Sequence, residues 1–161
     1  VRGVDINDEN YSVLERLAHW QAALNMARDR PWFGVGFGNY GAAYKSYALI
    51  NWSDALGHAH NYYLNALAEI GIAGLTAYVL LWGAIFWQTI HLLRRETWPI
   101  RGILLGLLGI WTAVTVHHFV DKLYVNNIYI HLGVLLGLLQ LVGLRVQSNS
   151  AYGREIGKAA E

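Results

Sequence analysis

The sequence has no cysteine and few charged residues, and both shortages narrow the range of functions. Without cysteine the chain forms no disulfide, offers no thiolate nucleophile and builds no Cys-ligated zinc site. Only 14% of the 161 residues are charged, and 12 basic against 11 acidic residues leave a net charge of +1. We therefore expect no polybasic surface and no nucleic-acid partner. Because 55% of the residues are hydrophobic, an ordinary water-soluble domain is not expected either.

Three long apolar segments predict an all-α, polytopic membrane protein. They cover residues 70–93, 102–120 and 123–144, and none of them contains Asp, Glu, Lys or Arg. A helix needs about 20 apolar residues to cross a hydrocarbon core roughly 30 Å thick. We therefore predict a three-helix transmembrane region over residues 63–145, preceded by a helical loop region outside the membrane over residues 1–62.

The positions of the basic residues predict how these helices are oriented. The loop over residues 94–101 and the tail over residues 146–161 both contain arginine or lysine. Short cationic loops remain on the cytoplasmic side of a membrane. Residues 1–62 and the turn at Asp121 and Lys122 are then expected on the opposite side, which in a bacterium is the periplasm or the cell exterior.

The region outside the membrane contains signals for two helices. Ser12-Val-Leu-Glu15 fits a capping box, and the apolar residues after it recur at helical spacing. We predict a helix from about residue 13 to residue 29, ending before Pro31, because proline disfavours the helical conformation of the preceding residue. A glycine-spaced turn over residues 34–38 follows, and the tyrosines of residues 40–47 then predict a shorter helix.

His60 is the strongest candidate for a catalytic residue. A single helix from near His60 to near Arg95 would be about 52 Å long at 1.5 Å per residue, so its first turns would lie in water. The positive end of the helix dipole disfavours an imidazolium there and keeps a neutral ring that can accept a proton. A neutral imidazole at the membrane surface suits a general base.

Two other interpretations of His60 stay open at this point. The ring could cap the helix at the interface without any chemical role. It could also bind a metal together with His58, but an H-x-H pair with no third and fourth ligand in view is a weak metal signal. We therefore predict neither a metal site nor a cofactor.

Charged residues near these helices supply further candidates. The guanidinium of Arg16 can bind two phosphate oxygens at once, which suits a diphosphate ligand, although the residue could also be an ordinary solvated one. Arg28 and Arg30 lie near the predicted helix end, where positive charge is favourable, so we interpret them first as stabilising. Glu69 follows His60 on the predicted long helix, and we expect it to pair with a basic group from outside this chain.

Two more features have alternative interpretations. The backbone amides of the glycine turn could bind an anion, but a tight turn that carries Trp32 and Phe33 into the membrane interface is the simpler interpretation. His117 and His118, with Asp121 close behind, could line a cavity that opens to the outer side. Placement at the membrane interface is the simpler interpretation of these histidines.

Three blocks of residues resemble a known family. They are the segments at residues 15–23 (ERLAHWQAA) and 29–40 (DRPWFGVGFGNY), and His60-Asn61 followed by nine residues and Gly71-Ile-Ala-Gly74. Over residues 12–142 the chain is similar to the carboxy-terminal part of the O-antigen ligase and polymerase superfamily. These proteins are multi-spanning glycosyltransferases of the bacterial inner membrane. They take a glycan from undecaprenyl diphosphate on the periplasmic side, without metal or nucleotide sugar.

The resemblance implies roles for individual residues. Arg16 matches the loop arginine of the family, which implies contact with the carrier diphosphate. His60 matches the motif histidine, which implies activation of the acceptor hydroxyl, and the acceptor is a lipid, a glycan or a protein. Asn61, and with it Arg28, Arg30 and Glu69, are expected as substrate or structural contacts.

Three spans are few for this superfamily, whose members have about a dozen. The chain also begins at Val1 rather than Met, so we expect a fragment that is inactive alone and lacks upstream arginines. The predicted function is that of an O-antigen ligase, with a polysaccharide polymerase or a protein O-glycosyltransferase as alternatives. A non-catalytic membrane scaffold or a transporter fragment is the alternative from another class.

Overall fold

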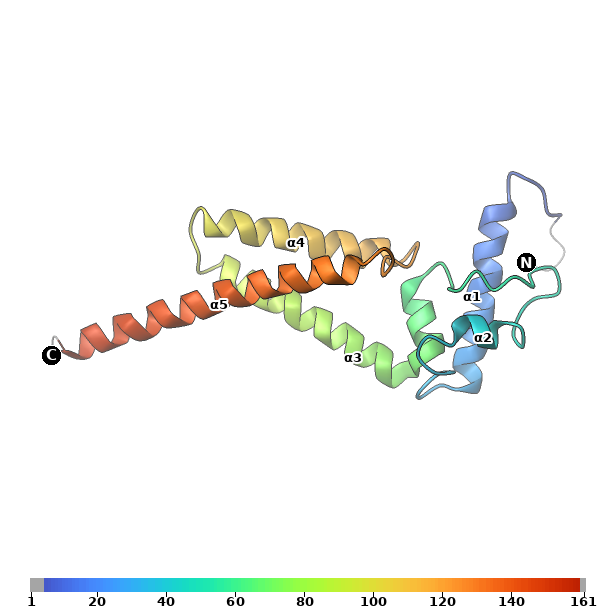
Figure 1. Ribbon diagram of the computed structural model, residues 1–161, viewed down its shortest axis with the longest axis horizontal. Coiled ribbons are helices and arrows are strands. Elements are labelled where there is room, and N and C mark those ends of the chain that lie inside the picture. The colour runs from blue at the N-terminus through green and yellow to red at the C-terminus, as the bar shows by residue number, and fades with distance from the viewer. Residues whose placement is uncertain (1–4, 160–161) are drawn as a thin grey trace. The chain divides into compact units, whose positions relative to one another are not determined.

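The computed structural model describes the backbone of residues 5–159 and the side chains of residues 5–148. Its helices are α1 (Tyr11–Asp29), α2 (Tyr40–Tyr44), α3 (Tyr62–Leu93), α4 (Ile100–His117) and α5 (Ile128–Ala159), as Figure 1 shows. The described residues contain no strand, which confirms the predicted all-α class. The side chains of Arg154 and Lys158, on which part of the predicted orientation rests, lie outside the described residues.

Three of these helices are long and apolar enough to span a membrane, as predicted. They are α3, α4 and residues Ile128–Ser148 of α5. The third helix begins later than the predicted residue 123, because Asn126 and Asn127 have positive φ angles of 48° and 61° that a helix does not allow. At its other end, α5 continues past residue 146, where the predicted tail begins.

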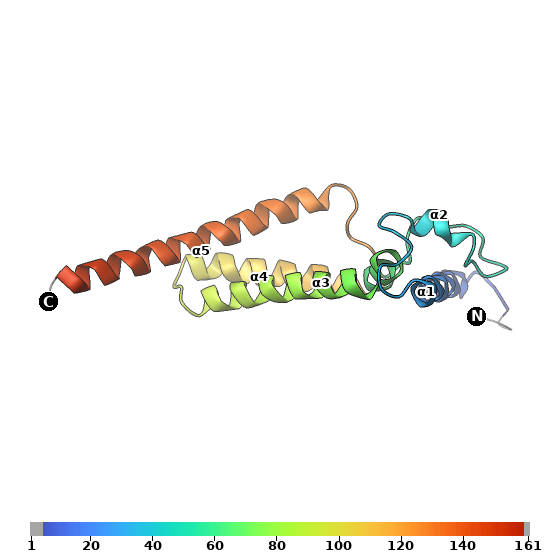
Figure 2. The same ribbon diagram turned by 90° about the horizontal axis from the view of Figure 1, so that it is seen from below.

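The chain divides into two compact units, and each is described by itself. The first contains residues 1–81 and 114–123, with α1, α2 and the beginning of α3. The second contains residues 82–113 and 124–161. In the second unit α4 runs in the opposite direction to the end of α3 (Figure 2), and the indole N–H of Trp111 donates to the hydroxyl of Thr89 at 3.1 Å.

Helix α1 confirms one predicted boundary and corrects the other. It ends at Asp29 as predicted. It begins at Tyr11, so Ser12 lies inside the helix and the predicted capping box is wrong. The amide of Tyr11 donates to the carbonyl of Asn7 at 2.9 Å instead, so a turn before the helix provides the backbone partner.

The predicted continuous helix from His60 to Arg95 is also wrong, because α3 is broken at Gly71. This residue has φ 65° and ψ −169°, and the helix changes direction there (Figure 1). Residues 72–93 then form a helix of about 33 Å at 1.5 Å per residue, which is close to the thickness of a hydrocarbon core. The break leaves Tyr62–Ile70 as a separate short segment before the apolar helix.

The glycine turn supplies the backbone partners that the broken helix lacks. The amides of Val35 and Gly36 donate to the carbonyls of Ala68 and Glu69, and the amides of residues 72 and 73 donate to the carbonyls of residues 31 and 32. A Cβ atom at Gly34 or at Gly71 would overlap with the backbone of the opposite segment. Glycine is therefore required at both positions by this close approach and by their positive φ angles.

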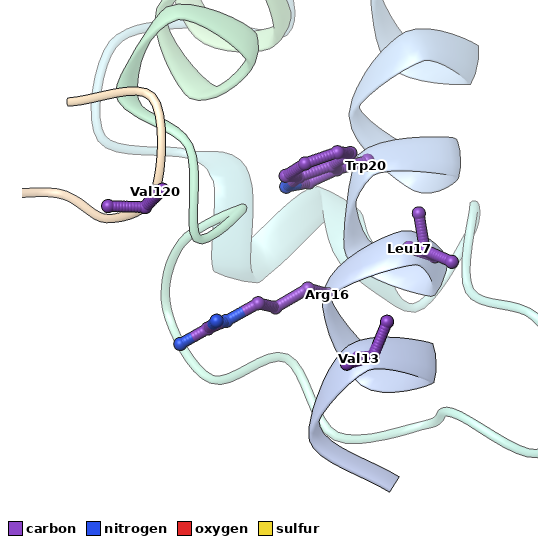
Figure 3. Close-up of a pocket in the computed structure, with 5 residues that line it drawn as sticks. All are labelled: Val13, Arg16, Leu17, Trp20 and Val120. Atoms are coloured by element: carbon purple, nitrogen blue, oxygen red, sulfur yellow. The ribbon is translucent and has the colours of Figure 1, made fainter. Parts of the chain in front are cut away.

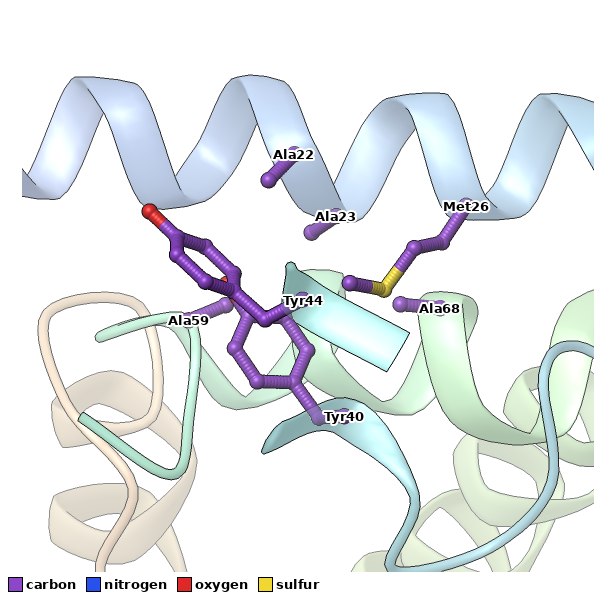
Figure 4. Packing of buried hydrophobic residues seen from close by; sticks show 7 residues of the cluster. All are labelled: Ala22, Ala23, Met26, Tyr40, Tyr44, Ala59 and Ala68. Carbon is purple, nitrogen blue, oxygen red and sulfur yellow. The ribbon is translucent and has the colours of Figure 1, made fainter. Parts of the chain in front are cut away.

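The core of the first unit packs α1 against α2 and the start of α3. Its buried residues are Ala22, Ala23, Met26, Tyr40, Tyr44, Ala59 and Ala68, shown in Figure 4. Alanines on α1 leave room for the two tyrosine rings of α2, and both rings are fully buried. The tyrosines of the predicted second helix are thus core residues, although the helix itself covers only Tyr40–Tyr44.

Candidate functional site

His60 lies in a tight turn immediately before α3. Its φ angle is 50°, so it is outside the helix rather than in its first turn as predicted. Asn61 caps the helix, since its side-chain oxygen accepts a hydrogen bond from the amide of Leu64 at 3.0 Å. The amide group of the same side chain donates to the carbonyl of Phe119 at 2.9 Å. Asn61 therefore has structural contacts, and they tie the His60 turn to the loop that follows α4.

The imidazole of His60 is enclosed but has no hydrogen-bond partner. Its side chain is 20% exposed. Both ring nitrogens are buried, and neither forms a hydrogen bond with any residue that the structure describes. Buried polar groups normally have partners, so an unsatisfied ring of this kind points to a ligand, a water molecule or a reactive role.

Two further side chains surround this ring. Asp121, from the loop after α4, places Oδ1 3.7 Å from Nδ1 of His60 and 4.0 Å from Nδ1 of His58. The rings of His58 and His60 are edge to face with centroids 4.5 Å apart. In the sequence Asp121 stands out only as part of a turn and of a possible cavity wall, and no local pattern connects it with His60.

A third histidine, to which the sequence pattern assigned no role, lies behind His60. The His19 ring is fully buried on α1, stacks on Tyr44 and lies 5.8 Å from the His60 ring, measured between centroids. The hydroxyl of Tyr40 donates to the backbone carbonyl of His19, so Nδ1 of His19 carries the proton that it shares with Tyr40. A histidine on the alanine-rich face of a predicted helix was the signal available in the sequence.

The surroundings of His19 and of His58 favour neutral rings at these two residues. Burial, with smaller contributions from the nearby His60 and His58, lowers the pKa of His19 to about 4. Burial is also the main reason why the pKa of His58 lies below its ordinary value, while the Asp121 carboxylate opposes that shift. Neutral imidazoles can accept protons or bind metal ions, which imidazolium ions cannot do.

Arg16 lies on a pocket that adjoins the same loop. The pocket has a volume of about 190 Å³ and is lined by Val13, Arg16, Leu17 and Trp20 of α1 and by Val120 (Figure 3). The side chains of Arg16 and Trp20 project from α1 in the same direction (Figure 3). Since Val120 precedes Asp121, the pocket and the histidine cluster share one loop.

The pocket offers hydrogen-bond donors that the described chain does not use. The Arg16 side chain is exposed and forms no ion pair or hydrogen bond with the described residues. The indole nitrogen of Trp20 is buried and has no partner among them either. A guanidinium beside an unpaired N–H can bind an anion through more than one oxygen.

The remaining predicted site residues lie elsewhere. Arg28 is exposed in the last turn of α1, and Arg30 is exposed just after it, with its amide donating to the carbonyl of Met26 at 3.0 Å. Glu69 is buried, and its carboxylate accepts a hydrogen bond from the amide of Tyr40 at 3.1 Å. Glu69 thus binds the first amide of α2, and its expected basic partner from outside the chain stays a prediction.

The glycine turn does not fit an anion site. Its amides at Gly34, Val35 and Gly36 all donate to backbone carbonyls. The aromatic side chains beside them, Trp32 and Phe33, are 66% and 79% exposed. Of the two interpretations, the tight turn that presents aromatic residues outwards is therefore the one that the hydrogen bonds favour.

Comparison with known proteins identifies the segment that holds this site. Residues 3–79, which include α1, α2, His60 and Gly71, match the family described as O-antigen ligase. This part of the chain is similar to the O-antigen ligase family. The resemblance inferred from the three sequence blocks is thereby confirmed.

A curated relative supports a link with membrane glycosyltransferases. The chain is 30% identical over 127 residues to a probable peptidoglycan glycosyltransferase, FtsW, of Thioalkalivibrio sulfidiphilus (strain HL-EbGR7). The matched region is 76% of this chain and 26% of that protein. The chain thus spans about a quarter of the length of that relative.

Proposed function

We propose that this O-antigen ligase segment forms part of the active site of a membrane glycosyltransferase. The reaction moves a glycan from undecaprenyl diphosphate to an acceptor hydroxyl on the periplasmic side of a bacterial inner membrane. The observation that carries the proposal is the enclosed, unpartnered imidazole of His60, which lies beside Asp121 and near the Arg16 pocket. The similarity to a probable peptidoglycan glycosyltransferase supports glycosyl transfer in general.

In the proposed reaction His60 is the general base. The acceptor oxygen forms a bond to the anomeric carbon, the bond from that carbon to the diphosphate oxygen breaks, and the diphosphate leaves with the electron pair. The hydroxyl proton passes to His60. The Asp121 carboxylate, 3.7 Å from Nδ1, is placed to accept a hydrogen bond from an Nδ1–H once the distance shortens in the complex. Nε2 is then the nitrogen that takes the proton.

Arg16 and Trp20 are proposed to stabilise the leaving diphosphate. Negative charge grows on the diphosphate as the glycosyl bond breaks, and donors aimed at that charge lower the barrier. The guanidinium of Arg16 can donate two parallel hydrogen bonds to phosphate oxygens, and the indole N–H of Trp20 can donate one more. The resemblance to the superfamily implies further arginines that complete this binding site.

Three versions of the proposed function differ in the molecule that accepts the glycan. An O-antigen ligase transfers the glycan to a lipid, a polymerase to a growing polysaccharide and a protein O-glycosyltransferase to a side-chain hydroxyl. The chemistry at His60 and Arg16 is the same in all three. A scaffold or transporter fragment, by contrast, would need no base at this position.

The test is a transfer assay with the purified full-length parent protein, a lipid-linked glycan donor and each class of acceptor. His60→Ala should lower the transfer rate by about 10²–10⁴-fold, because a positioned general base contributes this much. Donor binding should persist. His131→Ala is a matched control, since His131 is exposed on α5. A wild-type rate in His60→Ala would instead favour the scaffold or transporter.

The proposed orientation has its own test. A reporter fused after Leu56 should be accessible from outside the cytoplasm, and one fused after Arg95 should be cytoplasmic, because the loop over residues 94–101 carries the basic residues. The assay is reporter activity in cells that express the full-length protein. A cytoplasmic signal at Leu56 would contradict the periplasmic site.

A further inference from the structure

We propose that His58, His60 and Asp121 form a binding site for a transition-metal ion, Zn²⁺ in the first instance, and that the bound ion inhibits glycosyl transfer. The binding site depends only on the geometry of the three side chains. The inhibition rests on the proposed role of His60 as general base. The two parts can therefore fail separately.

The three side chains are close enough to share an ion. One ligand atom from each lies within 4.8 Å of the others. Nδ1 of His58 and of His60 lie 4.0 Å and 3.7 Å from the same oxygen of Asp121. A tetrahedral zinc ion with bonds of about 2.0–2.2 Å holds its ligand atoms roughly 3.3–3.6 Å apart. Small side-chain rotations close the remaining gap, and Asp121 is 43% exposed, so it has room to turn.

The chemical types of the three ligand side chains favour Zn²⁺ over Mg²⁺ and Ca²⁺. Two imidazoles and one carboxylate form the set found in zinc sites that keep a fourth, open position. Nitrogen donors favour zinc and its transition-metal neighbours, whereas Mg²⁺ and Ca²⁺ prefer oxygen donors alone. Mg²⁺ is therefore expected to leave this site empty at concentrations at which Zn²⁺ fills it.

The backbone holds the ligands in place without the ion. The amide of Ala59, between the two histidines, donates to the side chain of Asn65 at 3.2 Å. Asn61 donates to the carbonyl of Phe119, which ties the histidine turn to the loop that carries Asp121. The segments that supply the three ligands are thus joined in advance, so little ordering is needed when an ion binds.

The unsatisfied ring of His60 is the second, independent indication of a ligand. Its two buried nitrogens lack partners within the described chain, and a metal ion would satisfy one of them. Nδ1 of His58 accepts a hydrogen bond from the amide of His60 at 3.2 Å. His58 therefore binds the ion either through Nε2 or by giving up that hydrogen bond.

Metal bound at this site removes the proposed base from the reaction. When Nδ1 of His60 donates its lone pair to the ion, the proton of the neutral ring lies on Nε2, so Nε2 has no lone pair left to accept the hydroxyl proton. Zn²⁺ should therefore lower transfer, and a chelator should restore it. A metal required for transfer would show the opposite response to the chelator.

The experiment uses the full-length protein in detergent or lipid nanodiscs. Binding is measured first without substrate, by calorimetry with ZnCl₂ and by the visible absorption of bound Co²⁺. We expect one site per chain, with affinity at least tenfold weaker in His58→Ala and in His60→Ala. His131→Ala should bind as the wild type does. Absence of a site in the wild type, or an unchanged site in both variants, would overturn the metal site.

Transfer is then measured without Zn²⁺ and with free Zn²⁺ at about ten times the wild-type Kd, and each variant is compared with itself. The wild type and His131→Ala should be inhibited at least tenfold, with recovery after addition of EDTA and no inhibition by Mg²⁺. In His58→Ala the inhibition should fall below twofold. Equal inhibition of His58→Ala would place the ion on the diphosphate donor and contradict the proposal. Binding without inhibition would retain the site but overturn the role of His60.

Discussion

His19 and His60, two neighbouring histidines of the first unit, differ in the hydrogen bonds that their ring nitrogens form. The His19 ring is fully buried, shares a proton with Tyr40 and stacks on Tyr44. The His60 ring, 5.8 Å away between centroids, has two buried nitrogens without partners in the part of the chain described. The same residue type therefore serves as a core residue in one region and as a reactive candidate in the other.

This difference indicates which of the two histidines can take part in a reaction. Leaving a buried donor or acceptor without a partner costs about 1–3 kcal/mol. A buried ring that lacks hydrogen bonds in spite of this free-energy cost is typical of catalytic sites and of sites that bind a ligand. By this criterion the proposed base is His60, and His19 supports the shape of the site from behind.

Of the substitutions that test this difference between His60 and His19, Asp121→Asn is expected to have the largest effect on the transfer rate. The substitution keeps the size of the side chain but removes the charge 3.7 Å from Nδ1 of His60. Transfer should fall by about 10²-fold, because the ring loses the group that orients it. The assay is kcat with saturating donor, together with KM for the donor, which should change little. Asp54→Asn, at an exposed position, is the control. A normal kcat would separate Asp121 from the reaction.

Arg16→Lys is expected to have a smaller effect. An ammonium keeps the charge but loses the planar fork that donates two hydrogen bonds, so donor affinity and transfer should drop about tenfold. Arg28→Lys is the matched control, since Arg28 is exposed on the same helix away from the pocket. Binding of the lipid-linked donor is measured directly. If both variants bind the donor equally well, Arg16 is only a surface residue.

The smallest effect should appear in the pH dependence of stability through His19. Its pKa falls from 6.5 to about 4 on folding, so the unfolded chain binds the proton more readily. Stability should therefore decline as the pH falls from 6.5 to about 4, by up to about 3 kcal/mol from this group. His19→Gln should lack this part of the decline. The measurement is the Tm of the full-length protein in detergent at several pH values. Parallel curves for both proteins would contradict it.

Part of the candidate site was predictable from the sequence. His60 and Arg16 stood out because their side chains have the chemistry that proton transfer and phosphate binding need, and because both lie in blocks that resemble a known family. His19 and Trp20 were not assigned roles, and Asp121 was considered only as part of a cavity wall. Their relevance depends on what lies beside them, and no local pattern reports a neighbour from a distant part of the chain.

The sequence by itself determined the all-α class, the end of α1 at Asp29 and the three apolar helices. These follow from hydrophobicity, helical spacing and proline, which act over a few residues. The tertiary structure alone decided the break of α3 at Gly71 and the meeting of His60 with Asp121. Both depend on long-range contacts, since the glycine turn provides the backbone partners for the break and the loop after α4 carries the carboxylate to the histidine.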